Sequence, residues 1–146
     1  MINNNFEKKL KSKEFVFTAE TSPPDSTVRS EITDRVLCLK DLADAINVTD
    51  GASAKSHLSS LVVSSIIKDI EIEPILQLTT RDRNRIAIQS DLLGAWTLNI
   101  QNILCIYGDQ VETGDQPETK EVRDLDTLGV INTANYFKKE KKFPSG

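Results

Sequence analysis

Apolar residues follow two alternating patterns along the chain. Short apolar runs begin near residues 15, 45, 74 and 102, which is a spacing of roughly 29 residues. Between and after these runs, apolar positions recur every three or four residues, as on one face of an amphipathic helix. The pattern predicts four strand-helix units, with strands over 15–20, 45–49, 74–80 and 102–107.

The helices are expected over 28–43, 56–70, 82–98 and from about 125 onward. Pro23 and Pro24 end the first strand, because proline cannot donate to a sheet ladder. Candidate N-cap side chains precede the first helix at Asp25, Ser26 and Thr27, and Asp82 is the candidate cap of the third. Residues 1–13 are polar and charged and are expected to form a frayed leader.

Strands that alternate with amphipathic helices favour a parallel sheet with right-handed crossovers. Polar residues at the end of every strand suit a (β/α)8 barrel, where several strands contribute to one site, better than a doubly wound sheet. These residues are Glu20, Thr49 and Asp50, 79–82, and Gly108 and Asp109. No GxGxxG motif follows the first strand, which disfavours a dinucleotide-binding Rossmann unit.

A complete barrel takes about 250 residues, whereas this chain has 146. The expected fold is therefore α/β, the N-terminal half of a (β/α)8 TIM barrel with about four βα units. The domain would span 14–146, its C-terminal half being absent or supplied by another chain. An open half barrel would expose two sheet edges and an apolar inner face, which invites association, either as a homo-oligomer or with a partner subunit.

Composition narrows the function classes. Hydrophobic residues make up 38% and charged residues 27% of the chain, as in ordinary globular proteins, and the net charge is −4. This charge argues against a surface built for nucleic acid or anionic lipid, and no apolar run approaches the roughly 20 residues of a membrane span. Two cysteines and one histidine offer no disulfide framework and no histidine-rich metal site, so a reduced, cytoplasmic protein without a metal is expected.

Several strand-end residues are candidates for chemistry, each with a plainer alternative. Glu20 is either a general acid, desolvated in a cavity so that its pKa rises, or an exposed strand-terminal carboxylate. The three arginines of 81–85 either contact an anion near a helix N-terminus or pair locally with Asp82. Asp109 follows Gly108 and could accept hydrogen bonds from a heterocycle such as a pterin, or simply form a turn. His57 is expected to be a surface residue and Trp96 a packing residue.

The strand-end motifs together resemble one family. In order they are AETSPPD, VTDGA, PILQLTTRDRNR and NILCIYGDQ, followed by GDQP. This ordered set is similar to methylenetetrahydrofolate reductase, nearest the variants that carry a TRDRN segment. The resemblance implies a (β/α)8 barrel that binds FAD and reduces 5,10-methylenetetrahydrofolate to 5-methyltetrahydrofolate in one-carbon and methionine metabolism. Electrons would come from NADH, NADPH or another donor.

The resemblance also implies roles for single residues. Glu20 matches the acid that protonates the folate. Thr49, Asp50 and Ala52 match positions beside the flavin, and Gly108 and Asp109 match a pair beside the flavin and the pterin, where Asp109 would bind the substrate. Further cofactor-contacting positions fall on Gln77, Tyr107 and Val122.

The chain departs from the family pattern at two of these positions. Gln77 stands where bacterial members often have histidine, and Tyr107 where they often have arginine. The second half of the barrel, which supplies further flavin and folate contacts, is not in the chain, so little activity and weak flavin retention are expected of residues 1–146 alone. The alternatives are a non-catalytic half barrel that binds folate, flavin or a partner subunit, and a pterin-using methyltransferase that needs no flavin.

Overall fold

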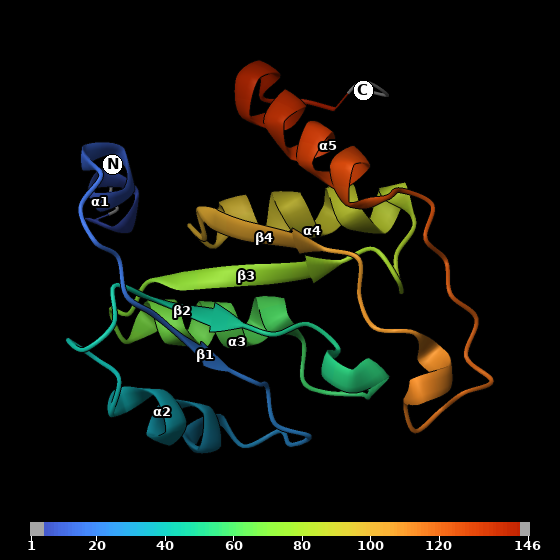
Figure 1. Ribbon diagram of the computed structural model, residues 1–146, viewed down its shortest axis with the longest axis horizontal. Helices are drawn as coiled ribbons and strands as arrows, with labels where there is room; N and C mark the ends of the chain where they lie inside the picture. The colour runs from blue at the N-terminus through green and yellow to red at the C-terminus, as the bar shows by residue number, and fades with distance from the viewer. Residues whose placement is uncertain (1–4, 144–146) are drawn as a thin grey trace.

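The computed structural model describes residues 5–143 and contains one sheet of four parallel strands in the order β1-β2-β3-β4 (Figure 1). The strands are β1 (Thr18–Thr21), β2 (Ala45–Val48), β3 (Pro74–Thr79) and β4 (Asn102–Ile106). Each strand lies beside the one before it in the chain, as in a barrel wall opened into a sheet. This confirms the predicted α/β fold with a partial (β/α) barrel unit.

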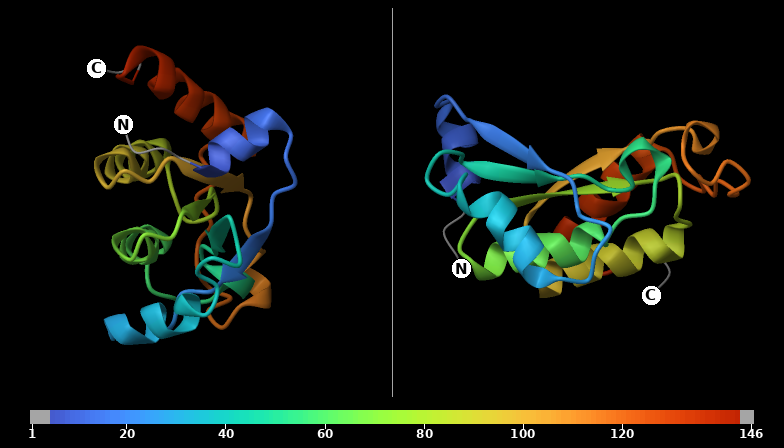
Figure 2. Two further views of the ribbon diagram at one scale, coloured as in Figure 1. Left: turned by 90° about the vertical axis from the view of Figure 1, so that its left-hand side faces the viewer. Right: turned by 90° about the horizontal axis from the view of Figure 1, so that it is seen from below.

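The helices after the strands pack against one face of the sheet (Figure 2). They are α2 (Arg29–Leu37), α3 (Ser60–Asp69), α4 (Arg85–Thr97) and α5 (Thr127–Glu140), and two short 3-10 turns, η1 (Ala52–Ala54) and η2 (Val111–Thr113), lie beyond the ends of β2 and β4. Since successive side chains of a strand point to opposite faces, every second residue meets these helices. The largest core cluster joins Ile46 and Val48 of β2 to Val63 and Ile67 of α3.

The opposite face of the sheet carries no helix among the described residues. Strand alternation places on it the apolar side chains of Ala45, Ile75, Leu104 and Ile106. The same face carries polar side chains from every strand, namely Thr18, Glu20, Asn47, Gln77, Thr79 and Asn102. The expected apolar inner face is therefore apolar only in part. β1 and β4 are the two edges of the sheet.

The first strand is shorter than the apolar run predicts. It begins at Thr18, and Phe15 and Phe17 before it are 86% and 61% exposed. The register explains this, because Thr18 lies opposite Ala45, where β2 itself begins. Residues before Thr18 therefore have no partner strand beside them.

The predicted N-caps of two helices differ from the structure, and α3 begins at Ser60, four residues later than expected. α2 begins at Arg29 after Val28, and none of the three candidate caps accepts from its first turn; Ser26 Oγ instead accepts from Val28 N (3.1 Å). α4 is capped by Asn84, whose Oδ1 accepts from Ala87 N (3.0 Å), and not by Asp82. The Asp82 carboxylate is not available because it binds the Arg81 guanidinium.

The stretch predicted to be a frayed leader contains a helix, α1 (Asn5–Ser12), so that prediction is wrong over these residues; residues 1–4 lie outside the described part. Lys9 forms an ion pair with Asp44, directly before β2, and Asp44 Oδ2 accepts from Phe17 N (2.9 Å). These contacts hold α1 at the amino ends of the strands, away from the strand-end motifs (Figure 1).

Candidate active site at the carboxyl ends of the strands

A cavity of about 340 Å³ lies where the four strands end. Its lining residues are Glu20, Thr49, Asp50, Ala52, Gln77, Ile106, Gly108 and Asp109. All of them except Ile106 were predicted as site residues from the sequence. Tyr107 and Val122 were also predicted, and neither lines this cavity.

Glu20 projects from edge strand β1 and contacts Gln77, whose Nε2 donates to Glu20 Oε2 over 3.2 Å. The Glu20 side chain is exposed. Of the two interpretations of Glu20, the exposed strand-terminal carboxylate agrees with this structure and the desolvated one does not, because β1 has a neighbour on one side only and no described helix covers its inner face. Gln77, from the central strand β3, is only 8% exposed.

Thr49 follows β2 and presents a buried hydroxyl group to the cavity wall. The residue is 7% exposed, and its Oγ1 has no hydrogen-bond partner in the described structure. A buried hydroxyl without a partner costs about 1–3 kcal/mol, which a ligand atom with hydrogen-bonding capacity would recover. Thr49 is thus the buried polar group of this site that a ligand would satisfy.

The Asp50 carboxylate is bound entirely by protein groups. Its oxygens accept from Ser60 Oγ (3.0 Å), Thr79 N (2.9 Å) and the guanidinium of Arg83 (2.6 Å). Burial disfavours the charge on Arg83, but Asp50 and Asp91 more than offset this, so the pKa of Arg83 lies above its ordinary value. Asp50 therefore fixes the ends of β2 and β3 and has no carboxylate oxygen left without a partner.

Asp109 connects the loops after β2 and β4. Its Oδ2 accepts from Ser53 N over 2.7 Å. Gly51, Ser53 and Ala54 all have φ between 53° and 59°, a left-handed conformation that costs a non-glycine residue roughly 1–2 kcal/mol. The hydrogen bond from Ser53 to Asp109 helps to hold this turn in place at the edge of the cavity.

Arg81 also links the loops that follow β2 and β4. This 4% exposed side chain donates through Nη1 to the carbonyl oxygens of Gly51 (3.2 Å) and Asp109 (3.3 Å). Its other nitrogens bind Asp82, which raises the pKa of Arg81 above its ordinary value. Gly108 has φ +86°, and a Cβ there would lie 2.2 Å from Thr79 Oγ1, so only glycine fits between this clamp and the end of β3.

The sequence did not mark Arg123 as a site residue. Its guanidinium stacks on the Tyr107 ring, 3.7 Å from the centroid, and donates to the Tyr107 carbonyl oxygen (2.6 Å). It also binds Glu121, whose pKa it lowers. Val122, next to Arg123 in the chain, donates from its N to Arg81 O (2.8 Å). Tyr107 and Val122 therefore help to fix the long segment between β4 and α5, residues 107–126, outside the cavity. The only sequence signal for Arg123 was its place at the end of that loop.

Local pairing is the correct interpretation of the arginines in 81–85. Arg81 binds Asp82, Arg83 binds Asp50 and Asp91, and Arg85 binds Asp124 in a bidentate pair of 2.8 and 2.9 Å. The Arg85 guanidinium and backbone N lower the pKa of Asp124 to about 2. All three cations are thus compensated by carboxylates of this chain.

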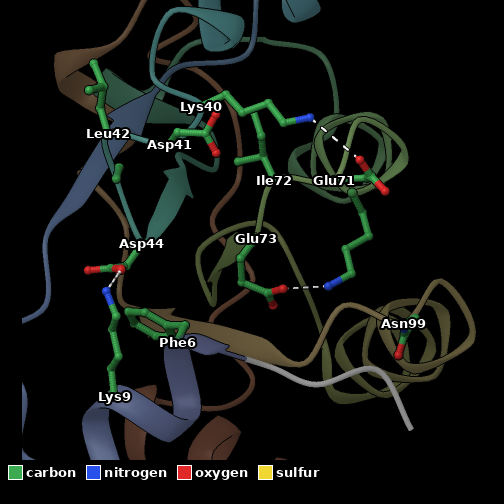
Figure 3. A pocket seen from close by; sticks show the side chains of 12 residues that line it. Phe6, Lys9, Lys40, Asp41, Leu42, Asp44, Glu71, Ile72, Glu73 and Asn99 are labelled. Carbon is green, nitrogen blue, oxygen red and sulfur yellow. Dashed lines mark hydrogen bonds and ion pairs between the residues drawn. The ribbon is translucent and has the colours of Figure 1, made fainter.

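A larger cavity, of about 740 Å³, lies at the opposite end of the sheet (Figure 3). Its three lysines are each paired with a carboxylate, in the pairs Lys9–Asp44, Lys40–Glu71 and Lys68–Glu73. The residues that the structure describes contain no cluster of side chains able to hold a metal ion. Nor is any described helix long and apolar enough to cross a membrane.

Comparison with known proteins agrees with the strand-end motifs. The model of the family described as methylenetetrahydrofolate reductase matches residues 5–141. No curated protein matches the chain. Because the family match covers nearly all of the 146 residues, the chain belongs to the methylenetetrahydrofolate reductase family.

Proposed function

We propose that this chain carries the strand-end site of a flavin-dependent reductase that converts 5,10-methylenetetrahydrofolate to 5-methyltetrahydrofolate. Family membership supports an oxidoreductase. The observation that carries this proposal is the single cavity lined by Glu20, Thr49, Gln77 and Asp109, four polar side chains from the ends of all four strands. NADH, NADPH or another donor would supply the electrons.

Glu20 is the proposed proton donor to the folate. A general acid must reach the substrate atom and exchange its proton with water between turnovers. The Glu20 carboxyl group meets both requirements, because it lines the cavity and remains exposed. Gln77 is the neighbour that touches it.

Asp109 is the proposed binding residue for the pterin. A pterin ring presents N–H donors, and a carboxylate is a strong acceptor for them. The Asp109 carboxylate accepts from Ser53 N at Oδ2, and each carboxylate oxygen can accept more than one hydrogen bond. Asp109 can therefore accept from a substrate while it still holds the turn after β2.

The cavity fits the ring system of a flavin in its chemistry. The buried Thr49 hydroxyl without a partner, the Gln77 amide and the backbone around Ala52 and Gly108 offer hydrogen-bonding groups beside a small apolar wall. These residues would hold FAD, which when bound supplies hydride to the folate. The arginines of 81–85 are committed to carboxylates of the chain, so we assign none of them to the phosphates.

The direct test mixes the chain with FAD, removes free flavin and measures the visible absorbance that remains. Retained flavin is then reduced anaerobically and challenged with methylenetetrahydrofolate. Folate-dependent reoxidation supports the reductase. Thr49→Val, which removes the hydroxyl group and keeps the shape, should weaken flavin retention, while Ser26→Ala, at a residue that does not line the cavity, should not.

One observation favours a second candidate, a non-catalytic binding module. Glu20 is exposed on an edge strand, without the desolvation that sharpens acid catalysis. A module would retain flavin or folate and leave reduced flavin unoxidised on addition of the folate. A pterin methyltransferase would bind folate and retain no flavin.

A further inference from the structure

Gln77 and Glu20 meet across a strand that lies between them. Gln77 is on β3 and Glu20 on β1, and β2 separates these strands in the sheet. The Gln77 side chain spans β2 on the uncovered face and brings Nε2 to 3.2 Å from Glu20 Oε2. A contact between non-adjacent strands requires both side chains to turn toward each other. This contact is made by side-chain groups and is separate from the backbone hydrogen bonds that pair the strands.

We propose that Gln77 is the positioning residue for Glu20, holding its carboxyl group toward the cavity in both the charged and the neutral state. This inference rests on the function proposed above and adds a role that the cofactor-binding assignment of Gln77 does not include. Gln77 acts through Glu20 and takes no proton itself.

The chemistry of an amide suits this task. The Gln77 amide carries two N–H donors and a carbonyl acceptor and has no charge near neutral pH. When Glu20 is ionised, Nε2 donates to it, and when Glu20 is protonated, a half-turn of the amide presents Oε1 to accept the carboxyl O–H. An acid that loses and regains a proton in each turnover thus keeps its partner throughout.

Burial makes Gln77 a firm support. It is 8% exposed, whereas Glu20 is exposed on an edge strand and has little else to fix its rotamer. The other charged groups that line the cavity, Asp50 and Asp109, bind Arg83 and Ser53 N respectively. The contact recorded for Glu20 is therefore with a neutral and well-packed side chain.

Side-chain amide NMR of the chain, without flavin or folate, tests the contact. The Gln77 NH2 signals should shift with pH in one step as Glu20 ionises. The step should vanish in Glu20→Gln, which keeps an amide partner and removes the charge; because Glu20 is exposed, this variant should fold normally. Asp109→Asn is the matched control and should retain the step. A step that survives Glu20→Gln, or a wild-type signal that does not move, overturns the proposal.

Single-turnover kinetics of the flavin-loaded chain test the consequence. Misplacing a catalytic group by about 1 Å costs on the order of 100-fold in rate, so Gln77→Leu should slow folate-dependent flavin reoxidation 10- to 100-fold. Gln77→His, which retains an N–H donor, should recover most of this loss. Unchanged reoxidation in Gln77→Leu overturns the positioning role. If no variant reoxidises flavin while the NMR step is present, the proposed function fails and the Gln77–Glu20 contact stands.

Discussion

Asp50 and Arg83 show how two strand-end residues with apparent binding chemistry are used to hold the protein together. The sequence places Asp50 beside a flexible glycine and Arg83 among three arginines, and both features are typical of ligand contacts. In the structure, Arg83 reaches back to Asp50, 2.6 Å away, and both side chains are largely buried. A sequence does not reveal this pairing, because the partners are separated by 33 positions and meet only once β2 and β3 are paired.

Replacing Arg83 should therefore destabilise the fold strongly. Arg83→Met keeps the length of the side chain and leaves the buried Asp50 carboxylate without its counter-ion, which costs about 3–5 kcal/mol. Arg29→Met is the control, since the Arg29–Asp69 pair is 58% exposed on both sides and should contribute less than about 1 kcal/mol. Urea unfolding measures both; equal losses would show that the Arg83 pair is no stronger than a surface pair.

Glu20→Gln tests the acid itself. The substitution preserves the size of the side chain and its contact with Gln77 but removes the transferable proton. Flavin reduction by the electron donor should survive, whereas folate reduction should fall by roughly 10²–10⁴-fold, the usual effect of losing a general acid. The two half-reactions are measured separately by stopped-flow absorbance, and an equal loss in both would exclude Glu20 from this role.

At the scale of elements, the period of apolar residues predicted the four strands and the helices between them, and the order of strand-end motifs predicted which residues line one cavity. The errors fall where long-range contacts override local pattern. α1 includes Lys9, which forms an ion pair with Asp44. β1 begins three residues later than predicted because its partner β2 begins only at Ala45. In the turn after β2, only Gly51 is a residue type that indicates a left-handed conformation; Ser53 and Ala54 adopt it too, and Ser53 N binds Asp109, 56 positions away.

The Arg85–Asp124 pair couples the start of α4 to the loop before α5 and gives a pH-dependent contribution to stability. Folding lowers the pKa of Asp124 from 3.8 to about 2. The contribution is therefore complete above the unfolded value and is lost as pH falls through the folded value. Asp124→Asn should lower the thermal midpoint near neutral pH, and this difference from the wild type should shrink as pH falls from about 4 toward 2.

The control for this prediction is Asp69→Asn, which removes a carboxylate from the exposed pair with Arg29. Thermal unfolding followed by circular dichroism at several pH values compares the two variants with the wild type. A difference between Asp124→Asn and wild type that stays constant down to pH 2 would show that the substitution acts through something other than this charge.

On the scale of the whole molecule, the sheet has helices on one face, and among residues 5–143 its edge strands β1 and β4 have no further strand beside them (Figures 1 and 2). The two cavities lie at opposite ends of its strands. An open sheet edge is a template for pairing with another chain. β4 adds an apolar side chain beside its edge, since Leu104 is 44% exposed on the uncovered face.

We expect the chain to associate at high concentration through these edges. Leu104→Lys places a charge beside the β4 edge and should reduce the association, since inward-pointing lysines are a known protection of edge strands. Leu128→Lys on α5, where Leu128 is 62% exposed, adds the same charge away from the sheet and should not. Analytical ultracentrifugation over a concentration series distinguishes them, and an equal effect of both lysines would point to net charge as the cause.

The polar side chains of the uncovered face restrict what can lie against it. Glu20, Asn47, Gln77 and Asn102 present polar atoms on this face, although Gln77 already binds Glu20 and the Asn102 amide already binds Glu73. An apolar surface that displaced water from this face would remove the hydration of their remaining polar atoms without replacing it, which is unfavourable. Any protein surface that closes over this sheet must bring donors and acceptors in matching positions. Hydrogen-bond complementarity, more than apolar contact, therefore decides which surface can cover this face. A surface without matching donors and acceptors would be disfavoured by the desolvation cost of these polar groups.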